Sequence, residues 1–484
     1  MYDAARRRTM LRYQIAPIHS FEDRPMTRFP FRKGRFANRR SVLKSAVGAA
    51  ALYLADAAAV YGAPANERIR LALVGCGGRG SSLGPGFAEQ PNCEVVYACD
   101  PNFPKAESAA RTLSAQQNGV ECKPLADFRR ALDDPQIDAI VSATPDHWHA
   151  LTTVWACQAG KDVYVEKPAC HSPWEGQQMV AAARRYDRVV QVGTQSRSAP
   201  YAMEAKRYIE QGKLGKIHFC RILNQKGMPN FPWEPDRPAP PGLNWDMWNG
   251  PAPECPYNPT YHRHWHHFWR YSGGDAVNDS IHQVDLARWL LGVELPKTVR
   301  SVGGRFNSEG AAETPDTQVT TYEFDDLIVS FELTLYTPYM LKIDPEVRNS
   351  DMFPLWSQCA TRIEIYGSEG LMVVGRHGGG WQVFDRPKSR QPVVKAQAYG
   401  RFPDPEHKAN FLACMRSRQR PNADIQIGHR STLWVLYANI SYRLGGRVLS
   451  IDPQTETFLD DAEAMALFRR TYRDPYRVPE VSRS

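Results

Sequence analysis

The chain has 484 residues, with 60 lysines and arginines against 52 aspartates and glutamates, which gives a formal net charge of +8. This length is enough for two or three domains and a large core. The whole positive surplus lies in residues 1–65, where 12 basic residues face 4 acidic ones, so the rest of the chain is neutral and shows no sign of nucleic-acid binding.

Residues 1–65 have the layout of an export signal. Arg39 and Arg40 precede a small, apolar stretch over 46–60, which is the order found in twin-arginine signals. That stretch is too short to cross a bilayer as a stable helix. We therefore expect a leader and flexible segment over 1–65, a periplasmic or exported protein, and no stable membrane insertion. A basic disordered tail is the alternative interpretation.

Residues 69–80 read IRLALVGCGGRG and join a short apolar run to a glycine-rich turn. The run Ile69–Val74 is typical of a strand buried on both faces. In the G-x-G-x-x-G pattern, Gly75 allows the turn, Gly77 lets the backbone approach a pyrophosphate, and Gly80 lets the next helix pack closely. The pattern predicts a dinucleotide site, with a phosphate-free turn as the alternative. The expected binding loop comprises Gly75, Cys76, Gly77, Gly78, Arg79 and Gly80.

A second apolar run, Val95–Cys99, ends at Asp100, twenty residues past Gly80. A carboxylate there can accept hydrogen bonds from both ribose hydroxyls of NAD, and it repels a 2′-phosphate. We therefore expect NAD as the cofactor. Arg79 could instead meet a 2′-phosphate, so NADP is the alternative.

Strand-like and helix-like segments alternate from about Arg68 to Val192, which predicts a doubly wound parallel sheet. The expected helices cover 81–90, 104–117 and 125–132, and further strands cover 137–143, 162–165 and 189–193. The segments 144–149 (TPDHWH) and 166–168 (EKP) follow two of these strands. Because ligands bind beyond the carboxyl ends of parallel strands, we expect both segments on the nicotinamide side, with Lys167 placed to bind a substrate hydroxyl.

Several further motifs follow in order: 193–195 (GTQ), Gly273-Gly274 before 282–285 (HQVD), and 366–370 (YGSEG). Together with the glycine loop and the two strand-end segments, this set resembles the glucose–fructose oxidoreductase / inositol dehydrogenase (Gfo/Idh/MocA) family. The resemblance runs from Ile69 to about Pro479. The leader and the tryptophan-rich middle of the chain look like the secreted, twin-arginine bacterial branch of that family.

The resemblance implies a second, α+β domain with a large open, mostly antiparallel sheet, whose face is a usual homodimer surface in the family. We therefore expect a homo-oligomer. The sequence agrees, with a hairpin over 319–335 joined at Asp325-Asp326 and short strands at 362–366, 371–374 and 381–384. The expected domains are a Rossmann domain over 66–192, a substrate and dimerisation domain over 193–406, and C-terminal helices and a tail over 407–484 that pack back on the Rossmann domain.

An insertion over 227–271 is dense in proline, tryptophan, histidine and tyrosine. Aromatic faces and planar hydrogen-bonding groups suit a sugar, so Trp245 and Trp269 are expected to contact substrate. The alternative is a proline-stiffened loop whose tryptophans pack on the core. The histidines over 262–267 have no carboxylate or cysteine at ligand spacing, and the ten cysteines are scattered without C-x-x-C, so we expect no metal and mostly buried thiols.

The segment 276–291 reads AVNDSIHQVDLARWLL and is expected to be one helix aimed at the nicotinamide. His282 is the expected general base, because the pKa of imidazole lies near neutrality. Many relatives carry aspartate four residues earlier, where this chain has Asn278. Asp279 either orients the His282 ring or caps the helix, and Asp285 could instead touch the substrate.

The chain is therefore expected to be an exported NAD(P)-dependent oxidoreductase that passes hydride between nicotinamide and a small carbohydrate. Redox-assisted glycoside hydrolysis and non-catalytic sugar binding are the alternatives. The expected catalytic residues are Lys167, His282 and Asp279. Beyond the glycine loop, the expected cofactor-binding residues are Asp100, Thr144, Pro145, His149, Glu166, Lys167 and Gln195. The expected substrate-binding residues are Lys167, Arg197, Trp245, Trp269, Asn278, His282 and Asp285.

Overall fold

The structure is a computed structural model that describes residues 68–228, 230–306, 309–343, 345–376, 378–388 and 390–482. The chain divides into two units, Met1–Asn66 and Glu67–Ser484, and the account below concerns the second. The predicted leader over 1–65 lies outside the described residues. Among the helices of the described part, none is long and apolar enough to cross a membrane.

Six parallel strands form the first sheet, in the order β3-β2-β1-β4-β5-β6. They are β1 (Ile69–Val74), β2 (Cys93–Cys99), β3 (Lys123–Leu125), β4 (Ala139–Ser142), β5 (Asp162–Val165) and β6 (Val190–Val192). The connecting helices are α2 (Gly80–Ala88), α3 (Phe103–Gln116), α4 (Arg129–Leu132), α5 (Asp146–Gln158) and α6 (Pro173–Arg185). The strand order reverses between β1 and β4, which is where such sheets bind ligands. The predicted doubly wound sheet is confirmed, except that the expected helix over 125–132 begins only at Arg129.

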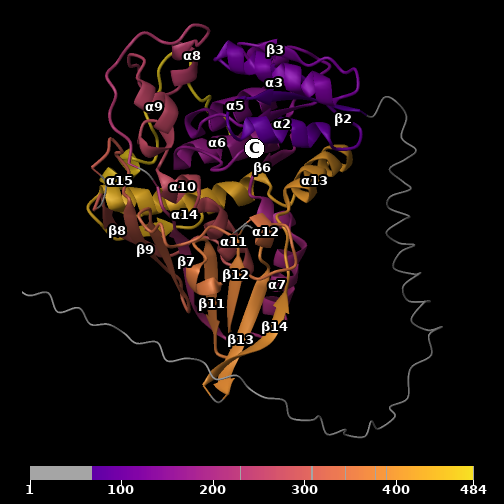
Figure 1. Ribbon diagram of the computed structural model, residues 1–484. Helices are drawn as coiled ribbons and strands as arrows, with labels where there is room; N and C mark the ends of the chain where they lie inside the picture. Colours follow the sequence, from indigo (N-terminus) through magenta and orange to yellow (C-terminus); the bar gives the residue numbers. More distant parts are fainter. Residues whose placement is uncertain are drawn as a thin grey trace, which may run out of the picture. The chain divides into compact units, whose positions relative to one another are not determined.

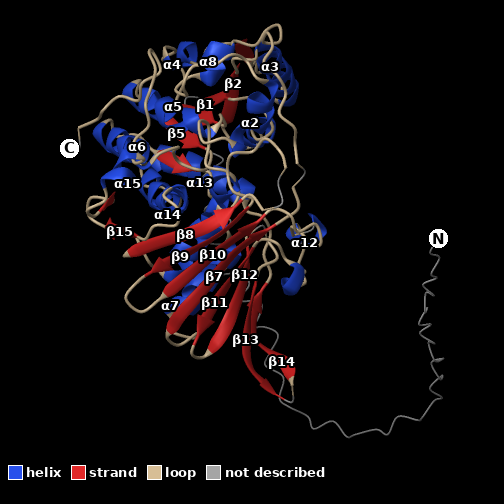
Figure 2. Cartoon of the chain, turned by 90° about the vertical axis from the view of Figure 1, so that its left-hand side faces the viewer, coloured by secondary structure: helices blue, strands red, loops and turns tan. Residues whose placement is uncertain are grey.

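Ten strands form the second sheet, in the order β14-β13-β12-β11-β7-β10-β9-β8-β15-β16 (Figure 2). They are β7 (Ile217–Gln225), β8 (Thr298–Gly304), β9 (Thr317–Glu323), β10 (Ile328–Thr334), β11 (Arg362–Gly367), β12 (Gly370–Gly375), β13 (Trp381–Lys388), β14 (Gln391–Ala398), β15 (Leu449–Asp452) and β16 (Thr457–Phe458). Only the β7–β10 pair among these described neighbours is parallel. The predicted antiparallel character and the β9–β10 hairpin are thereby confirmed.

One face of the second sheet is covered by helices, and alternating burial along β9 and β10 shows which side chains face them. Helix α7 (Pro200–Glu210) packs on β13, α11 (Ile281–Leu291) on β7, and α14 (Ile425–Arg443) on β8. Helix α14 also contacts β6 and α6 of the nucleotide-binding half, while α13 (Asp404–Ser417) contacts α2. The fully buried Trp434 and Tyr437 of α14 therefore belong to a core shared by both sheets. Figure 1 shows α14 between the two sheets. The predicted domain boundaries stay a prediction.

The remaining helices are short: α8 (Trp245–Asn249), α9 (Pro259–His264), α10 (Asp275–Asn278), α12 (Pro345–Arg348) and α15 (Ala462–Ala466). The single helix expected over 276–291 is wrong, because α10 ends at Asn278 and α11 begins at Ile281. The Ser280 hydroxyl donates a hydrogen bond to the Asp275 carbonyl oxygen and accepts one from the Asn224 side chain. These two hydrogen bonds hold the break between α10 and α11 in place. All ten cysteines are unpaired, and all but Cys255 are buried.

Candidate active site

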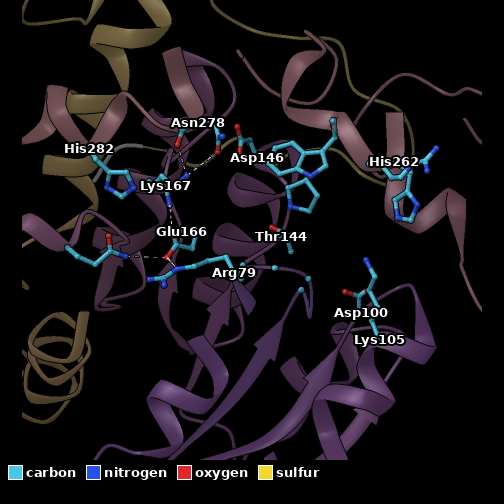
Figure 3. Close-up of a pocket in the computed structure, with 18 of the residues that line it drawn as sticks. Arg79, Asp100, Lys105, Thr144, Asp146, Glu166, Lys167, His262, Asn278 and His282 are labelled. Carbon is cyan, nitrogen blue, oxygen red and sulfur yellow. Dashed lines mark hydrogen bonds and ion pairs between the residues drawn. The ribbon is translucent and has the colours of Figure 1, made fainter. Parts of the chain in front are cut away.

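A cavity of about 590 Å³ lies at the carboxyl ends of β1, β2, β4 and β5, facing α10 and the start of α11 (Figure 3). It contains four of the six residues expected in the glycine loop, together with Lys167, Asn278 and His282, which were expected to act on or bind the substrate. Its lining residues are Gly75, Gly77, Gly78, Arg79, Asp100, Lys105, Ala143, Thr144, Pro145, Asp146, Glu166, Lys167, Gln195, Trp248, His262, Arg263, Trp265, Asn278, His282, Arg348, Arg376 and Phe402.

The glycines of the loop divide into two kinds. Gly75 has φ +90°, and a Cβ on it would lie 2.7 Å from the Ala143 carbonyl oxygen; a Cβ on Gly80 would lie 1.9 Å from the Gly75 oxygen. These two glycines are therefore required by the fold itself. A Cβ on Gly77 or Gly78 would meet nothing within 4 Å. The space above them is open to a ligand and lies at the N-terminus of α2, which fits the pyrophosphate of a dinucleotide.

Asp100 follows β2 and holds its carboxylate in the cavity through two main-chain contacts. The Cys76 N–H donates to Oδ2 at 2.9 Å, and the Asn102 N–H donates to Oδ1 at 2.8 Å. Burial raises the pKa of Asp100, while these two hydrogen bonds and the nearby Lys105 charge oppose the rise. The carboxylate thus stands where a ribose hydroxyl of NAD would donate to it, and Cys76 acts through its N–H although it does not line the cavity. Lys105 was missed because no motif marks it.

Arg79 is held by two carboxylates. Its Nε donates to Glu166 Oε1 and its Nη2 donates to Asp404 Oδ1, both at 2.7 Å. Asp404 stands at the start of α13 and also pairs with Lys408. The Arg79 charge is therefore matched within the chain, which weakens the case for a 2′-phosphate at this side chain and leaves NAD as the better fit.

Lys167 follows β5 and points at the break between α10 and α11. Its Nζ donates to the main-chain oxygen of Asn278 at 2.5 Å and to the Asn278 Oδ1 at 3.1 Å. Burial lowers the pKa of Lys167, and the carboxylates of Glu166 and Asp146 oppose that change. His282, in the first turn of α11, lines the same cavity. The structure thus brings the two principal expected catalytic side chains together with the glycine loop (Figure 3).

Asp279 does not line the cavity in the part of the chain described. Its carboxylate lies 3.0 Å from Lys226 Nζ, 3.0 Å from Lys342 Nζ and 2.8 Å from Arg376 Nη2. Arg376 does line the cavity, so Asp279 anchors one of its walls. The predicted role of Asp279 as the partner of the His282 ring stays a prediction.

Arg197 and Asp285, which were expected to bind substrate, lie outside the cavity and bind each other. Arg197 Nε donates to both Asp285 carboxylate oxygens at 2.9 Å, and Ser431 Oγ donates to the same carboxylate at 2.6 Å. Both partners are buried, at 5% and 0% side-chain exposure, and neither is among the cavity residues. They form an internal ion pair between η2 (Gln195–Ser198) and α11.

His149 also has a different position from the one expected, since it does not line the cavity. One ring nitrogen lies 2.6 Å from the Pro168 carbonyl oxygen and the other lies 2.9 Å from the Thr144 carbonyl oxygen. His149 therefore joins the two strand-end segments that carry Pro145 and Lys167. Gln195, which does line the cavity, donates to the Tyr164 hydroxyl at 3.2 Å.

The insertion contributes aromatic side chains, but not the two tryptophans expected. Trp248 and Trp265 line the cavity, whereas Trp245 stacks on Trp248 with ring centroids 4.8 Å apart. Trp245 Nε1 donates to the Cys255 carbonyl at 2.8 Å, and Trp269 lies in a second cavity. The sequence marked the aromatic segment, but it could not show which of the two stacked rings of α8 meets the ligand. Arg348 and Phe402, stacked at 3.9 Å, were missed because they carry no motif.

Comparison with known proteins bears on both halves of the chain. The family model described as "Oxidoreductase family, NAD-binding Rossmann fold" matches residues 69–194. The models "GFO/IDH/MocA C-terminal domain" and "Oxidoreductase family, C-terminal alpha/beta domain" match residues 248–373 and 369–478. Together these matches span most of the described residues.

Three proteins are similar to this chain in sequence or in fold. The chain is 28% identical over 315 residues to scyllo-inositol 2-dehydrogenase (NAD(+)) from Bacillus subtilis (strain 168), covering 64% of this chain and 75% of that protein. It is 28% identical over 233 residues to levoglucosan dehydrogenase from Pseudarthrobacter phenanthrenivorans, covering 47% of this chain and 52% of that one. The WlbA dehydrogenase from Bordetella pertussis, solved with NADH and UDP-GlcNAcA, superposes with a TM-score of 0.57 at 22% identity, over 80% of this chain and 99% of that chain. That likeness shows the fold.

Proposed function

Since the chain belongs to the GFO/IDH/MocA oxidoreductase family, we propose that it is an NAD-dependent enzyme that transfers hydride between nicotinamide and a hydroxyl-bearing carbon of a sugar, polyol or sugar derivative. One observation carries the proposal. Lys167 and His282 line the same cavity as the open glycines and Asp100, so a proton-transfer pair and a dinucleotide site share one space. The relatives named as inositol and levoglucosan dehydrogenases support a polyhydroxylated substrate.

Bound NAD supplies the acceptor or donor of the hydride, and the chain supplies position and proton transfer. Main-chain N–H groups of the glycine loop would hold the pyrophosphate of the dinucleotide, and the Asp100 carboxylate would accept a hydrogen bond from its ribose. Lys167, whose pKa is lowered by burial, donates a hydrogen bond to the reacting hydroxyl and shares its proton more readily than a free lysine. The His282 imidazole takes the proton of the substrate hydroxyl during oxidation and returns it during reduction. Trp248 and Trp265 offer ring faces to the substrate's C–H groups.

The test is turnover by the full-length protein. Purified protein is mixed with NAD+ and a panel of scyllo-inositol, myo-inositol, levoglucosan, glucose and glucuronate, and NADH formation is followed by absorbance. The proposal expects NADH with at least one neutral or acidic sugar or polyol. Turnover is expected to fall by about 10²–10⁴ in Lys167→Met, with NADH affinity retained. Undiminished turnover in Lys167→Met would overturn the assignment of the site.

We also infer export and self-association. Export rests on the order of Arg39-Arg40 and the apolar stretch over 46–60, and an Arg39→Lys/Arg40→Lys double variant should be retained in the cytoplasm on cell fractionation.

Self-association rests on exposed apolar side chains of the second sheet. Val302 and Val319 are 49% and 44% exposed and lie directly opposite each other on β8 and β9, with Ile328 on the neighbouring β10. Sedimentation should find an oligomer that Val302→Lys dissociates.

A further inference from the structure

A second cavity, of about 400 Å³, lies between the start of α6, the end of the insertion, α14 and the segment 466–471. It shares no lining residue with the cavity that holds Lys167 and His282. Trp269 forms part of its wall. The second cavity is therefore a separate space, to which the function proposed above assigns no role.

The charge of this cavity is one-sided. Four arginines line it, Arg270, Arg443, Arg469 and Arg470, and none of the described residues lining it is an aspartate or glutamate. Arg443 lies over the Trp269 ring at 5.2 Å, and Arg469 lies over the Trp174 ring at 3.7 Å. Aromatic faces fix the direction of a guanidinium without neutralising its charge. In the described part of the chain, no carboxylate lies within ion-pair distance of Arg270, Arg443 or Arg469.

Two glutamates, Glu175 and Glu313, lie near these four arginines, and each already accepts a hydrogen bond. Glu175 accepts hydrogen bonds from Arg470 Nε at 2.6 Å and from the Tyr472 hydroxyl at 2.9 Å. Glu313 accepts a hydrogen bond from the Trp269 N–H at 3.0 Å. Four guanidinium groups therefore face two carboxylates, and the cavity keeps a positive surplus that an anion would offset.

Among the lining residues, His171 and Arg470 each have a buried polar atom without a partner in the described part of the chain. His171 Nε2 lies 2.9 Å from the Trp269 carbonyl oxygen and so carries the proton, which leaves Nδ1 as an acceptor without a donor. Arg470 uses Nε on Glu175 and Nη2 on the His147 carbonyl, which leaves Nη1 as a donor without an acceptor. Buried groups of this kind cost free energy until a ligand satisfies them, and a hydroxyl can donate to one and accept from the other.

We propose that the second cavity is a binding site for a small hydroxylated organic anion, in which a carboxylate or phosphate meets the arginines and sugar-like hydroxyls meet His171 and Arg470. The Trp269 ring offers an apolar face to the C–H groups of such a ligand. The site contacts the first turn of α5, because Ser272 Oγ donates to Asp146 Oδ2 at 2.5 Å and Arg470 binds the His147 carbonyl. Asp146 lines the first cavity, so a ligand here touches residues that position the other site.

The experiment is isothermal titration of the full-length protein with four probes: glucuronate, glucose 6-phosphate, inorganic phosphate and glucose. The proposal expects binding of at least one charged sugar and weaker binding of both glucose and inorganic phosphate. The carboxylate and phosphate arms show which anion the site accepts. Absence of binding by both charged sugars, or equally tight binding of glucose, would overturn the proposal.

Variants distinguish this site from the first cavity. Arg443→Gln/Arg469→Gln should weaken binding of the charged sugar by about tenfold or more, because two charge-assisted contacts are lost. His282→Ala, in the first cavity, and Arg416→Gln, on the exposed side of α13, should leave that affinity unchanged. Arg469→Gln alone serves where the double variant fails to fold, since Arg469 is exposed. Binding that His282→Ala abolishes and the arginine variants retain would place the ligand in the first cavity and refute the second site.

Discussion

The two ends of the first cavity are built in different ways. At the nucleotide end, main-chain N–H groups at the ends of two neighbouring strands hold the group that meets the ligand, as when those of Cys76 and Asn102 donate to the Asp100 carboxylate. At the substrate end, side chains far apart in sequence hold one another, as when Lys167 Nζ donates to the Asn278 side-chain oxygen at 3.1 Å. A hydrogen bond from a main-chain N–H group is lost only when the backbone moves. A hydrogen bond from a side chain is lost when that one residue is replaced. The cofactor end is thus fixed by the fold, and the substrate end is open to variation.

The largest effect should come from breaking the substrate end alone. Lys167→Met keeps the length of the side chain but removes its donor and its proton. We expect turnover to fall by about 10²–10⁴, while the dissociation constant of NADH changes less than about threefold. Steady-state kinetics and a fluorescence titration measure the two quantities. A parallel loss of NADH affinity would show that the two ends are not independent.

A change outside both ends should affect stability without affecting affinity. Asp285→Asn removes the charge that pairs with the buried Arg197, beside Arg288, whose pKa burial lowers to about 10. Breaking one partner of a buried ion pair costs about 3–5 kcal/mol of unfolding free energy. Denaturant unfolding measures that loss, and KM in the folded fraction should stay at the wild-type value. A raised KM with unchanged stability would show that Asp285 binds the substrate.

A substitution at the nucleotide end can weaken NADH binding without destabilising the protein. Because a Cβ on Gly77 meets no atom of the chain within 4 Å, Gly77→Ala should leave the melting temperature unchanged. The same methyl group should collide with a bound pyrophosphate and weaken NADH binding by about tenfold or more, or about 1.4 kcal/mol. Gly80→Ala is the matched contrast, because its Cβ would overlap the Gly75 oxygen and should lower the melting temperature as well. Unaltered NADH binding in Gly77→Ala would place the cofactor elsewhere.

The smallest effect concerns pH. Burial lowers the pKa of Lys167 below its ordinary value of 10.5, so its neutral form becomes populated at lower pH than that of a free lysine. Because the charged form of Lys167 is the stronger hydrogen-bond donor to the reacting hydroxyl, the rate of alcohol oxidation should fall as pH rises, along a limb whose midpoint lies below 10.5. His262, whose pKa burial lowers to about 4, should stay neutral throughout that range. The limb should be absent from the pH profile of Lys167→Met; its persistence there would assign it to another group.

The sequence was most informative where a site depends on neighbouring residues. The glycine loop, Asp100 and the strand-end Lys167 were predicted because each follows a buried strand, and strand ends of a parallel sheet meet at one edge. Asp279 shows where this reasoning stops. Its three cationic partners, Lys226, Lys342 and Arg376, come from segments without a motif, and only the tertiary fold brings them together.

The lack of a local signal for long-range contacts also explains the expected site residues that the structure places outside the cavity. Arg197 and Asp285 have the polarity of substrate ligands, but they satisfy each other, and pairing across 88 residues leaves no local signal. Trp245 and Trp248 lie one turn apart on the same face of α8 and stack on each other, so the local sequence does not distinguish the ring that meets the ligand. Helical periodicity over 276–291 likewise concealed the break at Asp279 and Ser280, which the contacts of Ser280 hold.

The most direct test of the account is a titration of the full-length protein with NADH, following energy transfer from tryptophan to the nicotinamide. Trp248 and Trp265 line the cavity, so bound NADH should lie close to both indole rings. The account predicts saturable binding of one NADH per chain, with energy transfer, and weaker binding in Gly77→Ala. A folded protein that binds neither NADH nor NADPH would contradict the claim that this cavity holds a dinucleotide beside Lys167 and His282.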